Sequence, residues 1–142
     1  MNGEIIEQRL FDIVQSYNTA VLHIAGKVYY RGLRPIQTTL SAYKEDAVVA
    51  FLTGKNGDIQ QGSCLVNVYV PDIQADSGLS YMDKIRCREI ASALEQLPQY
   101  ATLQDNDIYF KQSDMVQTLE EGSLHQHFVS LKMNFHVINE NY

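Results

Sequence analysis

The alternation of apolar and polar residues is clearest in two runs, 46–55 and 61–70, which flank the pair Asn56-Gly57. Asn-Gly between two such runs is typical of a two-residue type I′ turn, in which both residues take φ > 0. We therefore expect an antiparallel hairpin with its turn at these two residues. This turn would set three pairs of opposite residues: Ala47 with Val66, Val49 with Cys64, and Phe51 with Gly62.

Opposite residues in a hairpin share a face, so the pattern also predicts which side chains lie together. One face is continuously apolar, and we expect it to pack in the core. The other face is too apolar for a strand pair in contact with water, so either the rest of the domain or another subunit should cover it. The apolar face carries Ala47, Val49, Phe51, Cys64, Val66 and Val68, and the second face carries Val48, Ala50, Leu52, Leu65 and Tyr69 among Gln61, Ser63 and Asn67.

Two helices are predicted, one on each side of this hairpin in the sequence. Residues 4–16 repeat apolar positions near the 3.6-residue period, which predicts an amphipathic helix. A second helix is expected after Ser80 and Asp83, which resemble a capping box with Asp in place of Glu. It would run to about Gln96, and Pro98 is expected to stop it. Its apolar stripe would consist of Met82, Ile85, Ile90, Ala93, Leu94 and Leu97.

The most regular alternation in the chain runs from Val129 to Val137 and predicts a strand. We expect this strand to pair with one inside residues 108–119 through a turn at 120–122. The other predicted elements are short strands at 20–24 and 27–30, and a loop or irregular edge strand at 31–44.

The order of elements is therefore helix, short strands, hairpin, helix and hairpin, within a single domain of residues 1–142. This order predicts an α+β fold: a hairpin-rich antiparallel β-sheet with a helix packed on one face, together with an N-terminal helix. The N-terminal helix is one candidate for covering the second face of the first hairpin, and a neighbouring subunit is the other.

Charge and composition narrow the function. The formal net charge of −6 argues against nucleic-acid binding driven by phosphate neutralisation. The basic residues Lys84, Arg86 and Arg88 do not form one patch, because residue 86 of a helix points away from residues 84 and 88. No apolar run approaches the ~20 residues of a membrane span. We expect Cys64 and Cys87 to be buried free thiols in a reducing compartment.

Catalytic and metal-binding motifs are not apparent. Gly54-Lys55 lacks the earlier glycine and the following Ser or Thr of a phosphate-binding loop. His125 and His127 would lie on one strand face about 7 Å apart, but the pattern places no third ligand beside them, so we expect no metal. No base is placed next to either cysteine. We predict no catalytic residues, no cofactor and no enzymatic activity.

One segment resembles a known family. The residues Glu45 to Val49, Asn56-Gly57, Gln60 to Gly62 and the strand end Val66-Asn67-Val68-Tyr69-Val70-Pro71-Asp72-Ile73 resemble small tail completion proteins of tailed bacteriophages and prophages. More broadly, the element order is similar to that of tail terminator proteins of lambda-like siphophages. The resemblance covers about Glu45 to Val137, and the first 44 residues match less well.

This resemblance implies a structural virion protein that forms a ring, commonly a hexamer, at the head-proximal end of the tail tube. The implied partners are the tube and the head–tail connector, and the implied location is the virion, with assembly in the host bacterial cytoplasm. Excess acidic charge suits a channel through which DNA slides. The alternatives are a non-enzymatic α+β module that binds a protein or small ligand, unrelated to phage, and an enzyme with dispersed catalytic residues.

A ring requires subunit interfaces, and two features indicate where they could lie. The second hairpin face offers apolar side chains for a neighbour to cover. Tyrosine is frequent, with nine residues, and it suits interfaces because it buries a ring and keeps one polar end. We predict that the subunit interface includes Val48, Leu52, Leu65, Tyr69, Tyr29 and Tyr30.

Overall fold

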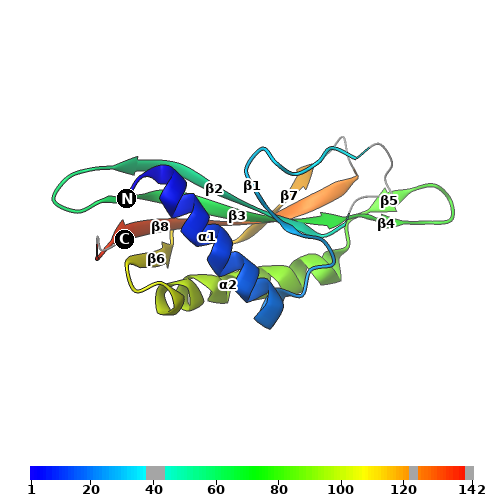
Figure 1. Cartoon of the computed structure of the whole chain (residues 1–142). Coiled ribbons are helices and arrows are strands. Elements are labelled where there is room, and N and C mark those ends of the chain that lie inside the picture. The colour runs from blue at the N-terminus through cyan, green and yellow to red at the C-terminus, as the bar shows by residue number, and fades with distance from the viewer. Residues whose placement is uncertain (38–43, 122–124, 140–142) are drawn as a thin grey trace.

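The computed structural model describes residues 1–37, 44–121 and 125–139, and within them it has the predicted α+β architecture (Figure 1). A mainly antiparallel sheet carries the two helices, and a small separate hairpin extends from it. The elements in chain order are α1 (Gly3–Tyr17), a π-helical turn η1 (Asn18–Leu22), β1 (Val28–Tyr30), β2 (Asp46–Lys55), β3 (Gln61–Pro71), β4 (Ile73–Gln74), β5 (Ser80–Tyr81), α2 (Lys84–Gln104), β6 (Ile108–Gln112), β7 (Gln117–Glu121) and β8 (Gln126–Val137).

The main sheet has the strand order β1-β2-β3-β8-β6, and β7 also pairs with β8. β6 lies beside the C-terminal half of β8 and β7 beside its N-terminal half, so both occupy the same edge of that strand. All pairs are antiparallel except β1–β2, which is parallel. The predicted strand 129–137 and its hairpin partner are therefore confirmed, although two short strands share the pairing. Part of the predicted turn at 120–122 lies outside the described residues.

Both helices pack on the same face of the main sheet (Figure 1). Their buried side chains meet the inward-pointing residues of β2, β3 and β8 in one core. An N-terminal helix covering the opposite face is therefore ruled out, because the apolar stripe of α1 points into the same core as that of α2. From α1 the core takes Ile6, Leu10, Ile13, Val14 and Tyr17; from α2 it takes Cys87, Ile90, Leu94, Leu97 and Ala101.

The turn of the first hairpin differs from the prediction. Phe51 lies opposite Cys64 instead of Gly62, a β-bulge follows between Phe51 and Thr53, and five residues, Asn56 to Gln60, connect the strands. Gly57 does not have a positive φ, so the type I′ turn is wrong. Within the longer loop the Gln60 Nε2 donates to the Asn56 Oδ1 at 2.6 Å. The register moved by two residues up to Phe51, and an even shift keeps each side chain on its predicted face.

The second helix starts later and ends later than predicted. Asp83, not Ser80, is its N-cap: the Asp83 side chain accepts a hydrogen bond from the Arg86 backbone N–H at 3.1 Å. The helix continues through Pro98 to Gln104. Pro98 is buried, and the Thr102 hydroxyl bonds both the N–H and the carbonyl of Phe110 on β6, so tertiary contacts hold the last turns in place. Ile85, predicted in the apolar stripe, is exposed.

Residues 20–24 were predicted as a strand, but they continue α1 as the π-helical turn η1 and its exit. The Asn18 side chain accepts from the Ile24 N–H at 2.8 Å, and His23 takes a left-handed conformation, so the chain turns back here. The predicted strand at 27–30 is confirmed as β1. Of the segment 31–44, residues 31–37 and 44 form no strand, and residues 38–43 lie outside the described part.

Candidate interaction surface

The sheet face opposite the helices carries a groove of about 470 Å³. We call this surface the open face and the depression the open-face groove. Its floor is apolar and comes from alternate residues of β2 and β3, and residues 31–36 border it on the β2 side. The floor consists of Val48, Ala50, Leu52, Leu65 and Tyr69 together with Asn67, and the borders are Arg31, Gly32, Arg34, Ile36, Glu121 and Gln126.

Arg34 holds the bordering segment against the sheet. Its Nε donates to the Asp46 carboxylate at 3.0 Å, and its terminal nitrogen donates to the Gln126 Oε1 at 3.1 Å. Its guanidinium carbon lies 4.2 Å from the centre of the Tyr69 ring, which is a cation–π contact. Phe128 on β8 also packs against the Tyr69 ring, with ring centres 5.3 Å apart. The contacts with Arg34 and Phe128 therefore hold the Tyr69 ring in place at the groove.

The structure brings most of the predicted interface residues together. Val48, Leu52, Leu65 and Tyr69 all line the open-face groove. Tyr29 pairs with Val48 across β1 and β2, so it shares the open face. Tyr30 does not: it pairs with Val49 on the helix-covered face and stacks on Phe11 of α1 with ring centres 4.3 Å apart.

Two buried polar atoms at the groove have no hydrogen-bond partner: the Oδ1 of Asn67 and the Nε2 of Gln126. Gln126 is 1% exposed, and its other amide atom is engaged by Arg34. Buried polar groups are nearly always bonded, so these two atoms are exceptions among the described residues. The alternation in sequence placed Asn67 on this face. Nothing in the pattern placed Arg34 or Gln126 there.

Two histidines, His125 and His127, lie at the N-terminal end of β8 and line a second pocket of about 370 Å³. His125 Nδ1 lies 2.6 Å from the Ser80 hydroxyl, and His127 Nδ1 lies 2.7 Å from the Asp72 carboxylate. These are two separate pairs, and among the described residues the carboxylate of Asp72 contacts His127, not the histidine that contacts the serine, whereas a catalytic triad requires one histidine to contact both. His125 precedes β8 and has φ 50, so the prediction that both imidazoles lie on one strand face is wrong. No group of three metal-ligating side chains occurs in the described residues.

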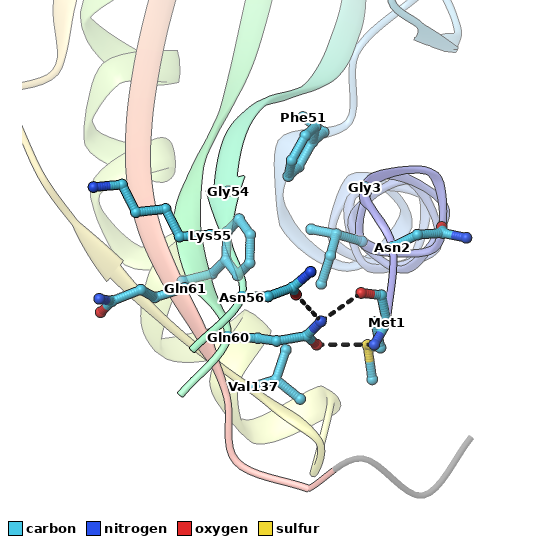
Figure 2. A pocket seen from close by; sticks show the side chains of 12 residues that line it. Met1, Asn2, Gly3, Phe51, Gly54, Lys55, Asn56, Gln60, Gln61 and Val137 are labelled. Atoms are coloured by element: carbon cyan, nitrogen blue, oxygen red, sulfur yellow. Dashed lines mark hydrogen bonds between the residues drawn. The ribbon is translucent and has the colours of Figure 1, made fainter. Parts of the chain in front are cut away.

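A third cavity, of about 250 Å³, lies between the start of α1 and the tip of the first hairpin (Figure 2). Gln60 closes one side: its amide oxygen accepts from the Met1 amino group, and its amide nitrogen donates to the Met1 carbonyl oxygen, each at 2.8 Å. Phe51 lies over the opposite side against Gly3. These contacts fasten the N-terminus to the hairpin, so we assign this cavity a structural role.

The two thiols are buried and unpaired, as predicted. Burial raises the pKa of Cys64 to about 12 and that of Cys87 to about 11. A thiol with such a pKa carries almost no thiolate near neutral pH, and the thiolate is the nucleophile. The environment of both cysteines is therefore that of core residues.

None of the helices in the described residues is long and apolar enough to cross a bilayer. Comparison with protein-family models gave no match, and comparison with curated proteins gave none either.

Proposed function

We propose that this chain is a structural protein of a tailed bacteriophage or prophage, of the tail completion or tail terminator kind, which assembles into a ring at the head–tail junction. The observation that carries the proposal is the open face, where an apolar groove with unpartnered polar atoms remains uncovered by either helix. Self-assembly into a ring would cover such a surface in every subunit.

The segment that resembles the phage proteins forms part of this surface. In the resembling run, Val66, Val68 and Val70 are buried beneath the helices, while Asn67 and Tyr69 face the groove. The same run ends at Pro71 and Asp72, where the main sheet gives way to the small β4–β5 hairpin. The resemblance and the open face therefore depend on the same strand, β3.

The excess acidic charge also suits this role. A ring around the path of the DNA should repel phosphates, and a net charge of −6 per chain is multiplied by the number of subunits. The proposal assigns no catalytic step to the chain, since Ser80–His125 and Asp72–His127 form two separate pairs at one pocket and the thiols are buried.

Particle assembly is the direct test of the phage role. The gene would be removed from the phage or prophage that carries it and supplied again in trans. We expect particles made without the protein to have tails of uncontrolled length, or tails not joined to filled heads, and we expect the supplied gene to restore them. Normal, infectious, tailed particles in its absence would refute the phage role and favour the alternative of an unrelated interaction or ligand-binding module.

The ring itself is tested on purified protein. Light scattering coupled to size exclusion, at increasing protein concentration, measures the mass, and negative-stain images show whether the assembly is closed. We expect a cyclic oligomer of six subunits. If the free chain remains monomeric, adding isolated tail tubes tests whether closure needs the tube as a template. A chain that stays monomeric under both conditions would contradict ring formation.

A further inference from the structure

The geometry points to a specific contact between copies: the β4–β5 hairpin of one chain, residues 72–81, docks in the open-face groove of the next. We call this hairpin the arm. The inference rests on the proposed function, because it names the contact by which the proposed ring would close.

The arm has one apolar face whose large side chains are exposed in the structure that the described residues form. Ile73 lies opposite Tyr81, and the Ala75 N–H bonds the Leu79 carbonyl at 2.8 Å, so these four residues lie on one side of the ribbon. Ile73 is 41% exposed, Leu79 69% and Tyr81 54%. The other side carries Gln74 and Ser80, and Ser80 is held by His125. The arm is therefore an amphipathic ribbon whose apolar side faces away from any described partner.

A ribbon of this kind needs support. An isolated two-stranded hairpin is marginally stable in water. In Figure 1 the arm projects beyond the end of the main sheet, and its two strands form a sheet of their own. Its contacts with the rest of the chain lie at its base, where Ser80 meets His125 and Asp72 meets His127 and the His125 carbonyl oxygen. Packing of its apolar side on another surface would supply the stability that the arm lacks alone.

The open-face groove has the matching chemistry. Its floor offers Val48, Leu52 and Leu65 to the apolar side of the arm. The outer edges of a two-stranded ribbon present unpaired backbone N–H and C=O groups. The Asn67 Oδ1 and the Gln126 Nε2 are shielded from solvent in the single chain, so backbone groups of the arm would bond them only after the two side chains turn outward. A purely apolar occupant would leave both atoms unsatisfied.

Charge complementarity indicates how the arm would be oriented in the groove. Arg31 borders the groove on the β2 side, and its side chain forms no ion pair with the residues that the structure describes. At the tip of the arm, Asp76 is exposed and likewise meets no cation among the described residues. Glu121 lies at the opposite border, on β7, so the complementary placement of Asp76 is at the Arg31 side.

The contact would be heterologous, because arm and groove are different surfaces of one chain. A heterologous contact repeats from subunit to subunit, and it closes a ring when the rotation permits. Two copies that exchange arms about a two-fold axis would use the same pair of surfaces, and the mass of the assembly distinguishes such a dimer from a ring.

Cysteine cross-linking tests the contact even where association is weak. Leu79→Cys and Leu52→Cys would be made as separate chains, mixed and oxidised; Cys64 and Cys87 are buried and contribute little background. We expect a disulfide mainly between the two different variants. The matched control is Leu103→Cys, since Leu103 is 72% exposed on α2 and Leu79 is 69% exposed on the arm. Equal cross-linking of Leu52→Cys to the arm and to the control would overturn the inference.

Charge reversal supplies an independent measurement. Arg31→Glu and Asp76→Lys should each weaken self-association by about tenfold, because each places like charges at the contact. The double variant should regain most of the loss. A double variant no better than either single variant would show that the two residues do not meet. Circular dichroism would confirm that all three variants remain folded.

The outcomes separate this inference from the proposed function. If rings form without the mixed cross-link and particles still require the protein, the contact between arm and groove is rejected and the phage role is kept. If the cross-link is specific but particles form normally without the protein, the contact between arm and groove is kept and the phage role is rejected.

Discussion

At the scale of single residues, the thiol of Cys64 links burial to a measurable pH dependence. Burial raises its pKa to about 12, while the ordinary value is about 9. Above pH 9 the unfolded thiol loses its proton while the folded one keeps it, so the unfolded state binds fewer protons and the free energy of unfolding falls as pH rises. Below pH 9 both states are protonated, and this contribution is constant.

We predict that Cys64→Ala removes this part of the pH dependence. Denaturant unfolding of both proteins between pH 8 and pH 10 should show a smaller fall in the free energy of unfolding for the variant. In the same range, the native chain should react slowly with a thiol reagent until denaturant is added. Rapid labelling of Cys64 in the folded protein would show that the β2–β3 face is not buried as described.

Arg9 illustrates a charged residue whose partners lie far away in sequence. Its guanidinium donates to Asp105 at 3.1 Å and to Asp107 at 2.9 Å, joining α1 to the turn between α2 and β6. Hydrogen bonding to Asp107 is the largest cause that raises the pKa of Arg9, and burial opposes it. Asp105 is only 8% exposed, so the hydrogen bonds from Arg9 replace part of the water that its carboxylate has lost.

Arg9→Ala should therefore lower the free energy of unfolding by about 1.5–3 kcal/mol, as expected for a hydrogen bond to a charged group that leaves a buried partner behind. Chemical denaturation measures this loss. Arg88→Ala is the matched control, because Arg88 is exposed on α2 and should change stability by less than about 0.5 kcal/mol. Similar losses in both variants would indicate that the loss comes from removing a positive charge from a helix, and not from the contacts of Arg9 with Asp105 and Asp107.

At the scale of elements, the first hairpin separates what alternation can predict from what it cannot. The period of two assigned Val49, Cys64 and Val66 to the core face correctly, because any even shift preserves the faces. It could not fix the turn. The observed register brings Gly62 opposite Gly54, where the strands approach closely after the bulge. That approach is a property of the bulged backbone, and the Asn56-Gly57 pair carries no information about it.

The observed register makes opposite predictions for two glycines. A Cβ at Gly62 would run into the Thr53 carbonyl oxygen, whereas a Cβ at Gly57 would meet its nearest atom, the Ile59 carbonyl oxygen, only at 3.9 Å. Gly62→Ala should thus cost about 1–3 kcal/mol through forced backbone movement. Gly57→Ala should be close to neutral. Thermal melts of the two variants make the comparison. A larger loss of melting temperature for Gly57→Ala than for Gly62→Ala would favour the type I′ turn.

The second helix shows tertiary contacts overriding a local stop signal. Pro98 cannot donate a backbone hydrogen bond, which predicts an end near this residue. However, Leu97, Pro98 and Ala101 all lie in the core, and Thr102 is bonded to Phe110 on β6. The partner strand β6 lies beyond the helix in sequence, so no reading confined to the helix could include its contribution.

At the scale of the whole molecule, the sequence indicated that the hairpin has a second apolar face, and the structure shows that neither helix covers it. Both helices use the other face, and among the described residues the segment that borders the second face is 31–37, held by Arg34. Tyr30 was placed at the interface because of its residue type. The parallel pairing of β1 with β2 instead directs it onto Phe11, and that pairing is a long-range property which local alternation does not encode.

The open face leads to a last prediction that separates folding from assembly. Leu52 is 37% exposed in the single chain, so Leu52→Asp loses part of its buried apolar contact but leaves the carboxylate in reach of water, and the variant should fold with a lowered melting temperature. In an assembly that covers the groove, the same carboxylate would be buried without a partner, which is costly. We therefore expect folded monomers by light scattering, while Leu103→Asp, on the exposed side of α2, should assemble as the unmodified chain does. Assembly of Leu52→Asp to the same mass would place the contact between subunits on another surface.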